Sequence, residues 1–537
     1  MVNMIQNLIT DSFFDGVHIH NQCTVIEVEN GRILNVKTSE PGSVNELLKH
    51  GNTFDFRGKF LSPGLIDSHN HFTLTSLKMA YQVNFGSSVS FSELKEILRK
   101  NMGNIIHGWI QGYGLNEYIM NERKLPDRHV VDSVINDIPV FITHVTEHYA
   151  LCNSRALDIA GITSGTDDPP NGRLGRDLNG NPNGILYEAG AMDLVKKFIP
   201  EYNVDDYEDA IIYGSEMYMK SGLTAVKDTG GTGADINEET RIMAFNNLSI
   251  GKRIDLRLMI ALPVYSIEDV DNRISMSRKI KENALLKFAG FKVFLDGSIM
   301  SRTAWMKNPY KKMKESDKTG NGMPLWNTDS FREAIHRLAK TGNHISIHVI
   351  GDRAIEEALN TIEYVQSEGV KSSFALVHAY KLNDGLIKRI EKLSTDIETQ
   401  TAFIYFIGDA LQQNLEDSES RCMFPVKTLM EKGINISDGS DSPVTPYSPV
   451  YGIFSSIYRI VKSGRKESVF SNNENITPED ALKIYTSMSS AVTGWNDIGS
   501  IKPGSCADFS IWSINPQKLD ADIGKWLNIK LYALVFR

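Results

Sequence analysis

Two histidines at the end of an apolar strand are the first residues in this chain whose types and spacing point to chemistry. His69 and His71 close the run PGLIDSHNH, which begins at Pro63. Side chains two positions apart on a strand point to the same face, so both imidazoles can reach one metal ion. A His-x-His pair also fits two ordinary polar residues at a strand end. Its position directly after a buried strand favours the metal site.

Three later β-type runs also end in residues that can bind a metal or transfer a proton. These are His348 in SIHVIGDRA, His378 in ALVHAY and Asp441 in SDGSDSPV. Imidazole and carboxylate suit zinc and related divalent ions, and they can leave a position open for water. A lone histidine on an apolar strand is commonly a satisfied core group. Several such residues at one edge of consecutive strands predict a shared site.

Lys292 lies inside the otherwise apolar run GFKVFLDG. An ammonium is rarely buried without a partner, because its transfer out of water is costly. The side chain either lies outside a barrel and extends to water, or faces inward and is carboxylated to an anionic carbamate that bridges two metals. Asp296 lies near the end of this run, and Arg302 follows it in the segment SIMSRTA. They could contact substrate or simply shape the loop.

Short apolar runs, each followed by a helical pattern, indicate repeated βα units and a parallel sheet. The predicted strands cover residues 64–68, 224–228, 256–262, 291–295, 345–349, 374–377, 396–400 and 434–437. Eight strands is the number that closes a TIM barrel. The long segment after the first strand leaves its C-terminal end, so we expect residues 72–192 to form a cap over the barrel mouth.

The two ends of the chain share a different pattern of short strands and turns. Asn30-Gly31 separates two β-type runs as a hairpin signal, and a turn at residues 499–504 precedes a strand at 507–512. We therefore predict a small β-sandwich domain from residues 1–62 and 496–537. The expected fold is α/β, a distorted TIM (β/α)8 barrel over residues 63–495 with a large insertion after its first strand.

The ordered set of runs PGLIDSHNHF, KVFLDGSIMSRTA, IHVIGDRAI, VHAY and GSDSPV resembles the amidohydrolase superfamily. More narrowly, it resembles the YtcJ-like branch that includes N-substituted formamide deformylase. Inside the insertion, residues 148–162 and 176–188 are similar to two further segments of that branch. The resemblance covers residues 55–516.

The resemblance implies a centre of one or two divalent metal ions, with zinc as the expected metal. It implies that His69 and His71 bind the more buried ion and that Lys292, as N-carboxylysine, bridges to a second. The second ion is then completed by His348 and His378. Asp441 matches the aspartate that binds metal and transfers protons.

The segments matched within the insertion make His148 and Asn153 expected substrate contacts, with Asp296 and Arg302 beside the barrel. Two departures from the branch concern substrate binding more than metal binding. Val377 stands where the branch has glutamate. Gln400 is followed by Thr-Ala-Phe-Ile, where the branch has Pro-x-His.

These residues predict hydrolysis of an amide or formamide C–N bond by a metal-activated hydroxide, with Asp441 passing the proton to the departing nitrogen. Ester or lactone hydrolysis, or deamination, on the same scaffold is the alternative. A non-catalytic metal-binding protein is the third hypothesis, and the complete set of ligands argues against it.

The composition of the chain limits the classes of binding partner that we expect. Lys and Arg number 57 against 66 Asp and Glu, a net charge of −9, without a basic run. Nucleic acid and anionic membrane surfaces are therefore excluded as expected partners. Cys23, Cys152, Cys422 and Cys506 have no paired spacing and indicate free thiols of a reducing compartment. No run approaches the roughly 20 apolar residues of a membrane span. We expect a cytoplasmic protein with a small-molecule substrate. Whether it forms a homodimer is left open by the sequence.

Overall fold

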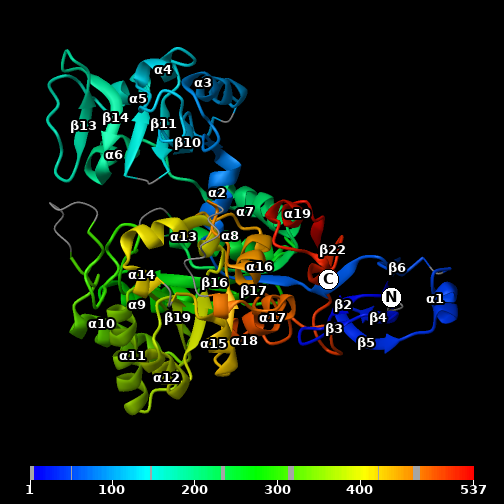
Figure 1. Cartoon of the computed structure of the whole chain (residues 1–537). Helices are drawn as coiled ribbons and strands as arrows, with labels where there is room; N and C mark the ends of the chain where they lie inside the picture. The colour runs from blue at the N-terminus through cyan, green and yellow to red at the C-terminus, as the bar shows by residue number, and fades with distance from the viewer. Residues whose placement is uncertain are drawn as a thin grey trace. The chain divides into compact units, whose positions relative to one another are not determined.

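The computed structural model describes residues 5–49, 51–103, 105–145, 148–231, 236–312, 320–420, 423–463 and 472–537. They divide into two compact units. The first, unit 1, comprises Met1–Leu74 with Gly214–Arg537, and the second, unit 2, is Thr75–Tyr213. Figure 1 shows the element order of both.

The centre of unit 1 is an eight-stranded parallel sheet in which the strands follow one another in chain order. Its members are β8 (Leu65–Asn70), β15 (Leu223–Asp228), β16 (Arg257–Val264), β17 (Leu286–Phe294), β18 (Ile345–Val349), β19 (Phe374–His378), β20 (Asp396–Thr399) and β21 (Ile436–Asp438). All eight predicted strands are confirmed, and with them the TIM-barrel fold class. Strands such as β8, β15 and β16 are buried at every position, as expected for strands covered on both faces.

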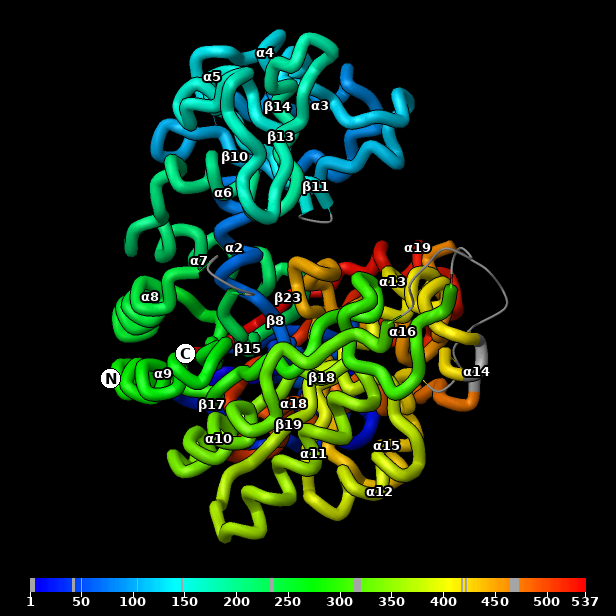
Figure 2. The backbone as a smooth tube through the Cα atoms, turned by 90° about the vertical axis from the view of Figure 1, so that its left-hand side faces the viewer, coloured from blue at the N-terminus to red at the C-terminus, as the bar shows by residue number. Residues whose placement is uncertain are grey.

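Helices surround this sheet (Figure 2). They include α8 (Glu238–Ile250), α9 (Asp269–Ser277), α10 (Thr328–Ala339), α11 (Asp352–Ser367), α12 (Asp384–Lys392), α13 (Ala402–Asn414), α15 (Val426–Glu431) and α16 (Pro449–Tyr458). Helix α10 illustrates the cause. It buries Phe331, Ala334, Ile335 and Leu338, which share one helical face, and the Asn327 side chain caps its first turn.

The first and last barrel strands meet through the chain just beyond their ends. The Asp441 amide donates to the His69 carbonyl at 2.8 Å, and the His71 amide donates to the Ser442 carbonyl at 3.0 Å. Gly439 permits this approach, because a Cβ there would lie 2.5 Å from the His69 nitrogen. Barrel closure therefore places both histidines of the His-x-His pair beside Asp441.

Both termini contribute to two further sheets of unit 1. One has the order β5-β4-β1-β6 and the other β23-β22-β7-β2-β3. Their strands are β1 (Gln6–Thr10), β2 (Phe13–Phe14), β3 (Ile19–His20), β4 (Thr24–Glu29), β5 (Arg32–Thr38), β6 (Thr53–Asp55), β7 (Phe60–Pro63), β22 (Asp508–Trp512) and β23 (Leu531–Val535). Asn30 and Gly31 join β4 to β5 with positive φ values of 51° and 73°, as a tight hairpin requires. One hydrophobic cluster unites the two sheets, with Leu8 and Ile26 packed beside Phe509.

Unit 2 is built on a six-stranded mixed sheet of order β13-β14-β12-β11-β10-β9. Its strands are β9 (Gln82–Asn84), β10 (Ile110–Leu115), β11 (Val140–His144), β12 (Tyr149–Cys152), β13 (Arg173–Arg176) and β14 (Pro182–Tyr187), with helices α3 (Phe91–Lys100), α4 (Arg128–Asp132), α5 (Ser154–Ile159) and α6 (Glu188–Lys196). The unit extends past the expected end at residue 192. Tyr202 stacks on Tyr81, and Asp206 pairs with His107, so residues that follow α6 belong with its first strands.

Two expectations from the sequence concern membrane-spanning helices and free cysteines. In the part of the chain that the structure describes, no helix has the length and apolar character needed to cross a membrane. Cys23, Cys152 and Cys506 are free thiols. Cys422 lies outside the described residues.

Replacement of Gly439 by alanine is expected to destabilise the barrel, because its Cβ would overlap the His69 backbone. Overpacking of this kind costs about 1–3 kcal/mol. Thermal unfolding would measure the loss. The control is Gly51→Ala, where a Cβ meets no atom within 4 Å. Equal melting temperatures for the two variants would contradict the role of Gly439 in closure.

Candidate metal centre

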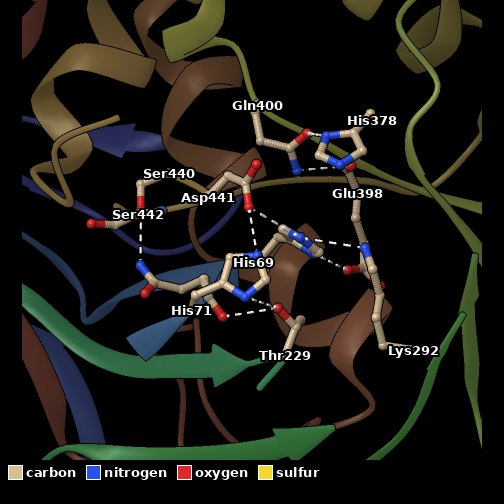
Figure 3. A network of polar contacts seen from close by, with 12 residues as sticks. His69, His71, Thr229, Lys292, His378, Glu398, Gln400, Ser440, Asp441 and Ser442 are labelled. Atoms are coloured by element: carbon tan, nitrogen blue, oxygen red, sulfur yellow. Dashed lines mark hydrogen bonds and ion pairs between the residues drawn. The ribbon is translucent and has the colours of Figure 1, made fainter. Parts of the chain in front are cut away.

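His69 and His71 follow the apolar start of β8 and turn into the barrel, where both are buried. Their Nε2 atoms lie 3.5 and 3.2 Å from Asp441 Oδ1 (Figure 3). The candidate ligand atoms of the three residues all lie within 4.8 Å of one another. Metal–ligand bonds of about 2 Å place neighbouring ligands about 3–4 Å apart. The cluster could therefore hold one ion if its ligand atoms moved slightly closer together.

The backbone that presents Asp441 and His378 is strained. Asp441 has a φ of +53° and His378 a φ of +68°, in the left-handed region that non-glycine residues rarely adopt. Such conformations persist only where surrounding contacts hold them, and they cluster at functional sites. Burial raises the pKa of Asp441, but its contacts with the His69 and His71 rings outweigh burial and hold the pKa well below its usual range. The residue is therefore a carboxylate, as a metal ligand must be.

Three imidazoles use Nδ1 for a hydrogen bond away from this centre. His71 Nδ1 donates to the Gly230 carbonyl at 2.7 Å, and His378 Nδ1 lies 2.5 Å from the Gln400 amide oxygen. His69 Nδ1 lies 3.3 Å from Glu398 Oε2. These partners are acceptors and can hold a ring proton on Nδ1, the tautomer that offers Nε2 to a metal.

His348 and His378 bring two more rings to the same end of the barrel. Their ring centres lie 4.5 Å apart, and the centres of His69 and His378 lie 5.5 Å apart. Burial lowers the pKa of His348 to about 3, and burial with the neighbouring His348 lowers the pKa of His378 well below its usual value. Both are therefore neutral, the form in which histidine binds metals.

Lys292 faces the barrel interior and is fully buried, which excludes the outward alternative. Its Nζ lies 3.4 Å from His69 Nε2. Among the described residues, no carboxylate pairs with this nitrogen. Burial lowers the pKa of Lys292 to about 7. A substantial fraction of the side chain is therefore the neutral amine near neutral pH.

The sequence interpretation missed a second buried lysine and its partner. Lys227 on β15 donates to Glu398 Oε1 on β20 at 2.5 Å, and Ser346 donates to the same oxygen at 2.7 Å. Burial raises the pKa of Glu398, but the Lys227 ammonium outweighs it and holds the pKa well below normal. The available signal was Lys227 inside the apolar run LTAVKD, the same kind of signal that singled out Lys292, whereas Glu398 lies in the mostly polar strand Asp396–Thr399.

Asp296 and Arg302 lie on the loop after β17. The Asp296 carboxylate is buried and accepts hydrogen bonds from the amides of Trp305, Ile350 and Gly351 at 2.8–2.9 Å. It therefore ties the loop to the end of β18. Arg302 donates through Nε to Asn414 at 2.7 Å, while its buried Nη2 has no hydrogen-bond partner in the described chain. A substrate contact by either residue stays a prediction.

The other two expected substrate contacts belong to unit 2. His148 is largely exposed and pairs with Glu188 at 3.1 Å. Asn153 is buried, and its side chain accepts from the amides of Val140 and Ala156. It also donates to the carbonyls of residues 135 and 138. Its amide is thus engaged in folding unit 2, and the substrate role of both residues stays a prediction.

Comparison with known proteins gives matches over nearly the whole chain. A model of the amidohydrolase family, Amidohydro_3, matches residues 52–525. YtcJ of Bacillus subtilis is 26% identical over 472 residues, covering 86% of this chain and 85% of that protein. N-substituted formamide deformylase of Arthrobacter pascens is 26% identical over 526 residues, covering 96% and 95%. The crystal structure of a metal-dependent hydrolase from Pyrococcus furiosus superposes with a TM-score of 0.76 at 24% identity, covering 96% of this chain and all of that one.

Asn153→Ala is expected to destabilise unit 2. The loss of a helix cap costs about 1 kcal/mol, and the Val140 amide, which also bonds this side chain, loses a buried partner. Limited proteolysis with thermal unfolding would detect the change, and exposed His148→Ala is the control. If Asn153→Ala alters the Michaelis constant at unchanged stability, the residue contacts substrate instead.

Proposed function

We propose that this chain, which belongs to the amidohydrolase family, is a metal-dependent hydrolase that cleaves the C–N bond of a small amide. The observation that carries the proposal is the convergence of His69, His71 and Asp441 at the end of the barrel. An N-substituted formamide is the best substrate hypothesis, supported by the formamide deformylase relative.

The donor set fits a divalent metal. Imidazole nitrogens and carboxylate oxygens are ligands that suit zinc. His69, His71 and Asp441 would hold one ion, and Lys292 as a carbamate would link it to a second held by His348 and His378. When bound, such a metal polarises a carbonyl group and makes water more acidic.

Asp441 is the proposed proton-transfer residue. Its carboxylate lies beside the Nε2 atoms of both His69 and His71, where it can accept a proton from the attacking water. It then delivers that proton to the amide nitrogen. This delivery matters because an amine leaves readily only after protonation.

Carboxylation of Lys292 follows from its environment. A buried ammonium without a carboxylate partner would be repelled by nearby divalent cations. The neutral amine can instead add to carbon dioxide and release a proton, which yields a carbamate with two oxygen ligands. Its position beside His69 Nε2 supports a bridging role.

A cytoplasmic location and a homodimer remain further predictions.

Asp441→Asn is expected to lower turnover by about a hundredfold or more, because the amide cannot accept the proton. Steady-state hydrolysis would be measured on N-substituted formamides and other amides, with esters, lactones and amino-heterocycles alongside. Metal content would be determined in parallel. The control is Asp67→Asn, a buried carboxylate near the same strand end that bonds Ser440 and Asn70. Near-normal turnover in Asp441→Asn would assign proton transfer elsewhere.

The comparison of substrates separates the functional hypotheses. Preferred cleavage of esters, lactones or amino-heterocycles by the wild type would replace the amide assignment. A protein that binds metal and cleaves none of these compounds would favour the non-catalytic hypothesis.

Lys292→Ala is expected to lose one metal per chain and most activity, with partial recovery on addition of a short carboxylate such as acetate. Carbon-13 NMR of the wild type in labelled bicarbonate would show the carbamate carbon directly. Lys287→Ala is the control, because that lysine lies on the same strand and contacts the Trp495 ring. One metal per chain and no carbamate signal in bicarbonate would rule out the modification.

A further inference from the structure

His69 differs from its neighbours in what holds its Nδ1 atom. His71 uses a backbone carbonyl and His378 a side-chain amide. For His69 the partner is the carboxylate of Glu398, at 3.3 Å. All of these side chains are buried.

From this geometry we infer that Glu398, fixed by Lys227 and Ser346, is a positioning residue that orients His69 for metal binding. The inference rests on the proposed function, in which His69 is a ligand. In this inference, strand β20 and the residue after it hold two of the proposed ligands in place. Glu398 and Gln400 are two positions apart and so point to the same face. From that face they hold His69 and His378, although β20 itself supplies none of the proposed ligands.

The two carboxylate oxygens of Glu398 have different hydrogen-bond partners. Oε1 accepts from Lys227 Nζ at 2.5 Å and from Ser346 Oγ at 2.7 Å. His344 Nε2 approaches the same oxygen only to 3.6 Å. Oε2 is left to face His69 Nδ1. Because one oxygen is anchored twice, the carboxylate cannot rotate away from the imidazole.

Lys227 explains how a carboxylate can stay charged at this depth. Glu398 and Lys227 are both fully buried. An isolated buried charge is strongly unfavourable, whereas a hydrogen-bonded pair is tolerated. Removal of the ammonium alone would leave that charge uncompensated. The two residues therefore act on His69 as one group.

The consequence is a preset tautomer. A carboxylate at Nδ1 favours the tautomer with the proton there and fixes the ring so that Nε2 faces the proposed metal position beside Asp441. Carboxylates that orient metal-binding histidines in this way raise metal affinity, and their loss typically lowers it 10–100-fold. The wild-type protein should thus present His69 in its metal-binding form before any metal arrives.

The experiment measures zinc affinity of the metal-free full-length protein by competition with a chromophoric chelator. Glu398→Gln is expected to weaken binding by about 10–100-fold. The double variant Lys227→Met/Glu398→Gln removes the unpaired ammonium, so that the fold survives, and is expected to show a comparable loss. Zinc affinity equal to the wild type in a folded variant would overturn the inference.

The matched control is Asp508→Asn, which breaks another buried ion pair, between Arg257 and Asp508, away from the histidines. It should lower the melting temperature and leave zinc affinity unchanged. If Asp508→Asn weakens zinc binding as much as Glu398→Gln, Glu398 acts only through stability and the inference fails.

A second measurement needs no variant. Nitrogen-15 NMR of the histidine rings in metal-free wild type should place the His69 proton on Nδ1, and a proton on Nε2 would overturn the inference. His69→Ala separates this failure from that of the proposed function. Wild-type zinc affinity in His69→Ala would reject the metal centre itself, whereas weak binding in His69→Ala with normal binding in Glu398→Gln would reject only the role of Glu398.

Discussion

Closure of the barrel is the constraint on which the candidate centre depends. The backbone contacts of His69 and His71 with Asp441 and Ser442 join the first and last strands, and they also set the distance between the imidazoles and the carboxylate. The fold and the site therefore share the same hydrogen bonds. A change at Gly439 that opens the barrel would separate the proposed ligands at the same time.

The barrel interior also has to accommodate charge. Two lysines are fully buried there, and the chain treats them differently. Lys227 has a carboxylate partner in Glu398, whereas Lys292 lies beside His69 and Phe294. A buried ammonium without a partner is costly. Lys227 is compensated by the charge of Glu398, whereas Lys292 requires a change in its own charge. Carboxylation of Lys292 together with metal binding would provide that change.

The barrel could be predicted from sequence because most of its strands are apolar runs with local signals. His69, His71 and Asp441 were found because they end such runs. The pairing of Lys227 with Glu398 could not be predicted, because it joins β15 to β20 across the barrel and depends on the three-dimensional register. For Asn153, in contrast, the sequence suggested a functional role that the hydrogen bonds of the structure do not require. A polar residue in a family-like segment suggested a substrate contact, while the structure engages all its side-chain hydrogen bonds in unit 2.

The structure shows what surrounds the second departure from the branch pattern, in which residues 401–403 replace Pro-x-His. Thr401, in place of proline, bonds Asp438 through its amide and hydroxyl, so this substitution supports the end of β21. Phe403, in place of histidine, stacks parallel to His378 with ring centres 6.0 Å apart. An apolar ring cannot donate a hydrogen bond to a substrate. The strand ends that carry the proposed ligands are therefore retained in this chain, while the wall beside His378 lacks a polar group that the branch pattern provides.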